Sequence, residues 1–115
     1  MWKVEIHPAV RAWLLGQDIK TQQGFEDAIR ILREFGPHLG RPLVDSILGS
    51  KTNNLKELRP GSSGRSEVRA LFAFDPKREA IVLVAGDKSL DWANWYRENI
   101  PLAEERYEEY LENET

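Results

Sequence analysis

Alternating apolar and charged residues mark the first element of the chain. Every second residue from Trp2 to Ile6 is apolar and the two between them are charged, which is the period of a strand with one buried face. Pro8 then stands where a helix places its first residue, and Gly16 ends the helical spacing that follows. The pattern therefore predicts a short strand and then a short helix.

From residue 20 to residue 35 the apolar positions recur at steps of three and four, and charged residues fill the opposite side. This is the period of an amphipathic helix, and its apolar side consists of Phe25, Ala28, Ile29, Leu32 and Phe35. Asp18 is suited to cap this helix, and Gly36 followed by Pro37 is suited to end it. The next segment, 37–54, is rich in Gly, Pro and Asn, so we expect a structured loop there.

Three strands are predicted in the second half of the chain, at 55–59, 65–74 and 80–86. The separating segments, 60–64 and 75–78, contain the Pro, Gly, Ser and Asp residues of tight turns, so we expect an antiparallel meander. The last of the three strands is apolar on both sides of the pleat and belongs at the centre of the sheet.

A final helix is expected after Asp91, whose side chain is that of a helix cap. Its predicted core face carries Trp92, Trp95 and Tyr96, and Pro101 is expected to restart or kink it. The element order is β-α-α-β-β-β-α. We predict one α+β domain over residues 1–115, a small antiparallel sheet with the N-terminal helices packed on one face and a C-terminal helix, and with its other face available.

The composition limits the kinds of site that the chain can form and the cellular location that we expect for it. Cysteine is absent, which excludes disulfides, zinc–thiolate sites and thiol nucleophiles and is compatible with a reducing cytosol. No apolar run approaches the length of a membrane span, and the first residues lack the pattern of a signal peptide. We therefore expect a cytoplasmic protein with no membrane partner.

Charge is distributed unevenly along the chain. The formal net charge is −3, but residues 104–115 carry six acids against one arginine, while residues 51–88 carry eight bases against five acids. A basic footprint is the usual sign of a nucleic-acid partner. Here that footprint is confined to the middle of the chain.

The basic residues of this middle region that fall on or beside neighbouring predicted strands are Lys56, Arg59, Arg65, Arg69 and Lys88. Such residues make most protein contacts to phosphates, and a concave group of them offsets the negative charge that develops on a phosphate group in the transition state. By strand alternation Arg59 shares a face with Glu57, and Arg69 shares one with Leu71. Solvated edge charges are the plainer interpretation, but Arg69 lies inside an otherwise apolar strand.

The usual acid–base and metal-binding residues are not grouped in the sequence. His7 precedes a helix and His38 lies in a predicted loop, so we expect capping or surface roles for both. Without cysteine or clustered histidine, neither a metal nor a cofactor is expected. A Gly-rich phosphate loop, a nucleophile elbow and an HExxH motif are also absent from the sequence.

Several segments between Leu55 and Leu111 have a distinctive order and spacing: Lys56-Glu57-Leu58-Arg59, Arg69-Ala70-Leu71-Phe72-Ala73-Phe74-Asp75, Gly86-Asp87-Lys88, Trp92, Trp95-Tyr96 and Ile100-Pro101-Leu102-Ala103-Glu104. With these segments the chain resembles the phage-derived, HigB-like branch of the RelE/ParE toxin superfamily over nearly its whole length, and before residue 50 only the β-α-α outline agrees. The resemblance implies a type II toxin–antitoxin toxin that cleaves messenger RNA on the ribosome without a metal. It also implies an oligomer with a cognate helix-turn-helix antitoxin of the HigA/Xre-like kind.

Carried onto matching positions, the resemblance implies Arg59, Arg69 and Lys88 as catalytic residues, with Lys56 as a further candidate. From the basic strand residues and the position of the tyrosine, we expect Lys56, Arg65 and Tyr96 to bind RNA. The implied reaction is attack of a ribose 2′-hydroxyl on the adjacent phosphate, which leaves a cyclic phosphate. The general base stays unassigned.

Two other functions remain open at this point. A ParE-like protein of the same fold would inhibit DNA gyrase by binding, without catalysis. A non-enzymatic interaction module would use the cationic face only to dock an acidic partner, and the low overall basicity of the chain is consistent with that alternative.

Overall fold

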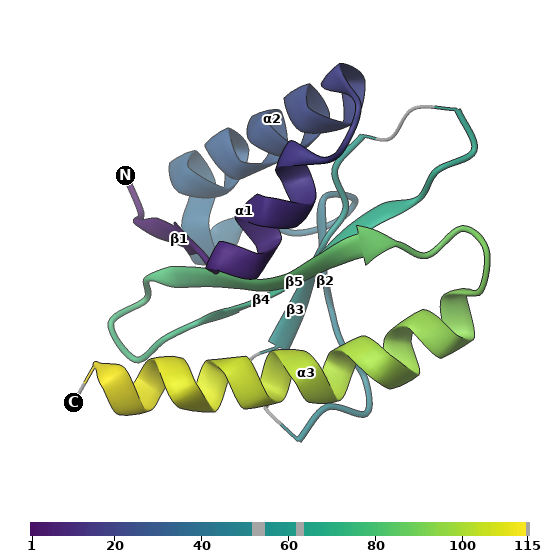
Figure 1. Ribbon diagram of the computed structural model, residues 1–115. Coiled ribbons are helices and arrows are strands. Elements are labelled where there is room, and N and C mark those ends of the chain that lie inside the picture. Colours follow the sequence, from purple (N-terminus) through teal and green to yellow (C-terminus); the bar gives the residue numbers. More distant parts are fainter. Residues whose placement is uncertain (52–54, 62–63, 115) are drawn as a thin grey trace.

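The computed structural model describes residues 1–51, 55–61 and 64–114, and within them five strands form one sheet (Figure 1). The strands lie in the order β1-β5-β4-β3-β2. Their bounds are Val4–Ile6 for β1, Val44–Ser46 for β2, Leu55–Leu58 for β3, Val68–Phe74 for β4 and Ala80–Asp87 for β5. The sheet is mixed, because β1 pairs with β5 in parallel whereas the other pairs are antiparallel.

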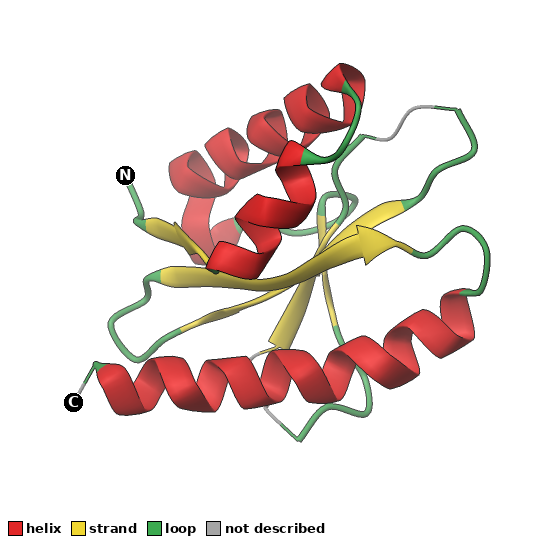
Figure 2. Ribbon diagram, viewed as in Figure 1, coloured by secondary structure: helices red, strands yellow, loops and turns green. Residues whose placement is uncertain are grey.

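Helices cover both faces of this sheet, as Figures 1 and 2 show. The helices α1, Pro8–Leu15, and α2, Ile19–Phe35, lie on one face, and α3, Trp92–Asn113, runs across the other. The expectation of an available second face is therefore wrong over most of its length. The α+β class and the order of the predicted elements are confirmed.

Two hydrophobic cores result, one on each side of the sheet. The first joins α1 and α2 to side chains such as Phe72 and Val82, and the second joins α3 to Leu71 and Leu83. Because side chains alternate along a strand, an apolar run such as β5 can supply both cores at once. That is the physical reason for the unbroken apolar run at 80–85.

A bulge between β4 and β5 changes which face the end of β5 presents. Leu71 pairs with Val84, but the next residue, Phe72, pairs with Val82, so Leu83 has no partner across the ladder. One extra residue reverses the alternation beyond it. As a consequence Gly86 and the residue two positions later, Lys88, face α3.

The helix ends follow the predicted caps. Asp18 accepts from the backbone N–H of Thr21, and Gly36 ends α2 with a φ of 55°. A side chain at Gly36 would also collide with the Trp2 indole, since a Cβ there would lie 2.2 Å from the ring. Phe35, expected on the core side, is exposed instead, because α2 ends there.

The loop expected at 37–54 contains more order than its composition suggested. A 3₁₀ turn, η1, spans Gly36–His38, and β2 forms the edge strand of the sheet. Residues 52–54 of this predicted loop and residues 62–63 of the predicted turn lie outside the described residues. Helix α3 continues through Pro101, so the expected restart is wrong. None of the helices in the described ranges has the length and apolar character needed to cross a bilayer.

Candidate phosphate-binding site

The register of β3 against β4 brings the predicted cations onto one face. Leu58 pairs with Ala70, so the next residue, Arg59, lies opposite Arg69. Glu57 pairs with Leu71, which belongs to the core under α3. The two faces left open by the sequence therefore coincide, and both point toward α3.

Glu57 lies at the centre of this group and is only 1% exposed. Its Oε1 accepts from Arg59 Nε at 2.9 Å, and Arg69 Nε lies 4.0 Å from the same oxygen. Its Oε2 accepts from the hydroxyl of Tyr96 on α3. A buried carboxylate is costly without such partners, so Glu57 holds Arg59 and Tyr96 in defined positions.

Lys88 joins the group through the same tyrosine. Its Nζ donates to the Tyr96 hydroxyl at 3.1 Å and lies 5.1 Å from the ring centroid. Burial, and then the hydrogen bond to Glu57, raise the pKa of Tyr96 above its ordinary value. The phenol therefore stays protonated near neutral pH, which lets it donate to Glu57 while it accepts from Lys88.

A second carboxylate, Asp45 on β2, engages the outer side of Arg59. Asp45 accepts from Arg59 Nη2 at 3.3 Å and from Arg41 Nη2 at 2.8 Å. The hydrogen bond from Arg41, and then that from the Ser46 backbone N–H, hold the pKa of Asp45 below its ordinary value. Arg59 is thus fixed between two acids, and it contributes little unneutralised charge of its own.

The guanidinium group of Arg69 is only partly hydrogen-bonded within the described residues. Its side chain is 17% exposed, and Nη1 donates to the carbonyl of Val68 at 2.7 Å. Its Nε is buried and has no hydrogen-bond partner within the described part of the chain. Guanidinium groups carry five N–H donors, and buried polar groups normally find partners. Arg69 is therefore the member of the group best suited to take up an anion.

The end of β5 is held in place by two close contacts. Gly86 lies under the Trp95 indole, and a Cβ there would come within 2.5 Å of Nε1. Asp87 Oδ1 accepts from the backbone N–H groups of Glu67 and Ser89. Burial raises the pKa of Asp87, but these hydrogen bonds outweigh burial, and the net pKa is below the ordinary value. Both contacts fix the backbone that carries Lys88.

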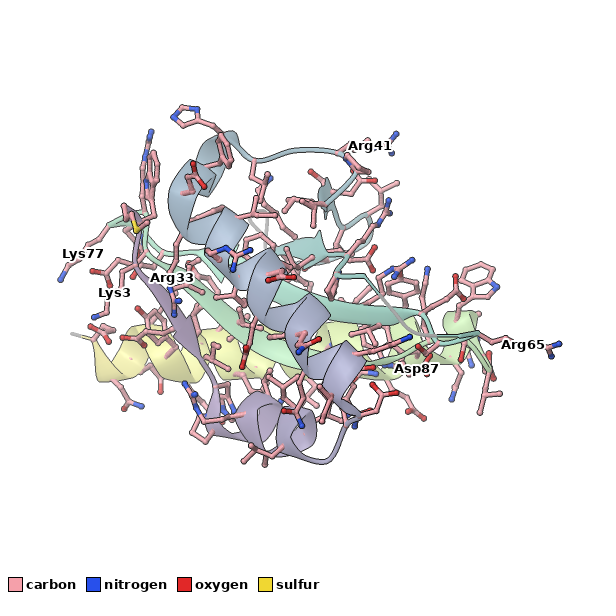
Figure 3. All side chains as sticks on the ribbon, turned by 90° about the horizontal axis from the view of Figure 1, so that it is seen from above. Lys3, Arg33, Arg41, Arg65, Lys77 and Asp87 are labelled. Carbon is pink, nitrogen blue, oxygen red and sulfur yellow. The ribbon has the colours of Figure 1, made fainter. Side chains whose placement is uncertain are left out.

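The remaining predicted residues do not join the group. By alternation Lys56 faces away from Glu57, and it lines a separate hollow with His38 and Arg78. Arg65 lies in the loop before β4 and points away from the body of the protein (Figure 3). His7 caps α1 by accepting from the Ala9 N–H, as expected.

Three members of the arrangement were missed as functional candidates: Glu57, Asp45 and Trp95. For Glu57 the sequence held a signal, because it occupies the same strand face as the buried Leu55. An acid at a core-facing position requires partners, and Arg59, two residues later, is one of them. Asp45 lay in a segment interpreted as loop, so its pairing was not accessible.

Comparison with known proteins places the chain in a family. Residues 12–108 match the model described as "Phage derived protein Gp49-like (DUF891)". The chain belongs to this family. It agrees with the phage-derived branch named from the resemblance, whereas membership of the wider RelE/ParE superfamily stays a prediction.

Two proteins of Mycobacterium tuberculosis are similar over nearly the whole chain. One, named "Putative toxin HigB2", is 52% identical over 110 residues, which is 96% of this chain and 54% of that protein. The other, named "Putative toxin HigB3", is 43% identical over 107 residues, 93% of this chain and 91% of that protein. The chain thus spans about half the length of the first relative and most of the second.

Proposed function

We propose that this protein is the toxin of a toxin–antitoxin pair and that it acts as a ribosome-dependent endonuclease on messenger RNA. The names of the two relatives support the toxin assignment. The observation that carries the catalytic proposal is the convergence of Arg59, Arg69 and Lys88 on Glu57 and Tyr96.

In the proposed reaction the ribose 2′-oxygen bonds to the adjacent phosphorus and the bond from phosphorus to the 5′-oxygen breaks. The 2′-hydroxyl proton passes to solvent, and the products are a cyclic phosphate and a 5′-hydroxyl end. Arg69, whose side chain is 17% exposed, binds the phosphate and stabilises the charge that develops on it. Alignment of the substrate in the ribosomal decoding site supplies much of the remaining rate.

Lys88 is proposed to donate a proton to the departing 5′-oxygen. Its hydrogen bond to the Tyr96 hydroxyl fixes the direction of its Nζ. Tyr96 is in turn fixed by Glu57, so the lysine, the tyrosine and the carboxylate act as one positioned chain. Arg59 neutralises Glu57 in this scheme, and its role is to hold the site together more than to touch the phosphate.

The proposed function implies binding partners. A helix-turn-helix antitoxin would inhibit the toxin by binding it, and the ribosome and its messenger RNA would be the targets, all in the cytoplasm. Arg65, exposed beside the site, is proposed as an outer contact to RNA phosphates. Lys56 lies on the other face and is not included.

The test is to express the chain alone, as wild type and as Arg69→Ala, and to follow growth and map the 5′ ends of cellular messenger RNA. Lys56→Ala is the matched control, because it removes a strand cation from the opposite face. We expect new in-frame 5′ ends with wild type and Lys56→Ala, and on the order of 10²-fold fewer with Arg69→Ala.

The rival functions give different results in this experiment when the binding of the same variants to the antitoxin is measured alongside. Growth arrest without new messenger RNA ends would contradict the nuclease and favour a gyrase-binding toxin. Undiminished arrest and cleavage by Arg69→Ala, together with loss of antitoxin binding, would indicate that the cationic group only docks an acidic partner.

A further inference from the structure

Trp92, the first residue of α3, lies on the surface beside the candidate site. Trp92 is 63% exposed, and the preceding apolar residue, Leu90, is fully exposed. The expectation that Trp92 belongs to the core face of the helix is therefore wrong. Helix α3 meets the sheet here through Trp95 on Gly86 and through the Tyr96 hydroxyl on Glu57.

The exposed indole touches the same tyrosine ring that holds the catalytic lysine. The Trp92 and Tyr96 ring centroids are 6.5 Å apart with an interplanar angle of 71°. Lys88 Nζ lies 5.1 Å from the Tyr96 centroid. Because Trp92 meets Tyr96 edge to face, the contact leaves flat indole surface accessible next to a cation.

We propose that Trp92 is a stacking surface for an RNA base next to the phosphate that the cationic group binds. The proposal rests on the proposed nuclease function and deepens it by naming a contact to single-stranded RNA. Aromatic side chains beside a positively charged groove are the usual means of holding single-stranded nucleic acid, because every base offers a π face. Lys88 and Trp92 both contact the Tyr96 ring, which places a cation and an exposed indole next to the same side chain.

A protein partner is the other occupant that an exposed tryptophan could serve. The neighbouring charges favour RNA, since Lys88 contacts Tyr96 and Arg69 lies near Glu57, and both are cations of the group proposed to bind phosphate. Leu90 separates the two alternatives. It is apolar, adjacent and fully exposed, so a protein interface would use it, whereas base stacking would not.

The experiment measures binding of a short 2′-O-methyl RNA, which cannot be cleaved, by quenching of tryptophan fluorescence and by an independent anisotropy titration. The proteins are wild type, Trp92→Ala, Trp92→Phe and the control Leu90→Ala. An abasic backbone of equal length serves as the second probe. The affinity of the same variants for the purified antitoxin is measured in parallel.

We expect Trp92→Ala to weaken binding of the RNA about fivefold to a hundredfold, Trp92→Phe to retain part of it, and Leu90→Ala to match wild type. The abasic backbone should bind wild type and Trp92→Ala alike. In ribosome assays the KM should rise while kcat changes little.

Equal RNA binding by wild type and Trp92→Ala overturns the proposal, even if messenger RNA cleavage is observed. Loss of antitoxin affinity in both Trp92→Ala and Leu90→Ala, with RNA binding unchanged, also overturns it and indicates a protein interface. Base-dependent binding that needs Trp92, in a protein that produces no messenger RNA ends, upholds the stacking contact and contradicts the nuclease function instead.

Discussion

Replacing Glu57 by glutamine tests whether one buried carboxylate organises the cationic group. The amide has nearly the same shape and can still accept from the Tyr96 hydroxyl. It cannot offset the charge of Arg59, whose Nε lies 2.9 Å from the carboxylate. The change therefore removes the charge of the central residue and little else.

The expected cost follows from burial and from the partner that remains. Breaking a fully buried ion pair costs about 3–5 kcal/mol, but Arg59 is 36% exposed and keeps Asp45 at 3.3 Å. A hydrogen bond to a charged group contributes about 1.5–3 kcal/mol. We therefore expect Glu57→Gln to lower the free energy of unfolding by about 2–3 kcal/mol, which for a chain of 115 residues lowers the Tm by about 10 °C.

Urea unfolding monitored by circular dichroism, supported by a thermal melt, measures this difference. Glu67→Gln is the matched control, because Glu67 is 50% exposed and lies 4.0 Å from Arg69. The control should change stability by no more than about 0.5 kcal/mol. If the two variants are equally stable, Glu57 does not organise the site and the reasoning is refuted.

Three further predictions use other parts of the same structure. Gly86→Ala should lower stability by about 1–3 kcal/mol and abolish toxicity, since its Cβ would meet Trp95 at 2.5 Å, whereas Gly40→Ala, with open space around it, should do neither. Burial raises the pKa of all three tyrosines. The protonated phenols therefore contribute fully to stability below about pH 10, and this contribution is lost as the pH rises further. Phenolate absorbance that grows near pH 10 in the folded protein would contradict this prediction. The pKa of Asp87 is lowered, so its carboxylate stabilises the fold above about pH 4 and this stabilisation is lost at lower pH. In Asp87→Asn the free energy of unfolding should therefore fall less steeply as the pH is lowered below about 4. An unchanged dependence on pH would show that the Asp87 carboxylate is not responsible.

The sequence predicted the elements well where one periodicity dominated. The strands of the meander and the long amphipathic helix follow directly from periods of two and of three to four residues. The edge strand β2 was missed because it has only three residues and lies among Gly and Pro. The position of α3 on the second face was also missed, since both faces of an apolar strand look alike in sequence.

The residues of the candidate site were also predictable from the sequence only in part. Arg69 could be singled out from sequence because a charge inside an apolar strand needs a reason. The bulge at Leu83 could not, although it turns Lys88 toward α3. Glu57 and Tyr96 meet across 39 positions of chain, and only the packing of the helix on the sheet brings them together.

The chemistry of the cleaved ends in a purified system tests the proposed nuclease activity of the protein. Ribosomes programmed with a defined messenger RNA are mixed with wild-type protein or with Arg69→Ala, and both new termini are analysed. We expect a 5′-hydroxyl and a 2′,3′-cyclic phosphate at the cut, formed on the order of 10²-fold more slowly by the variant. Inhibition of translation with intact messenger RNA, or equal cleavage by the two proteins, would contradict it.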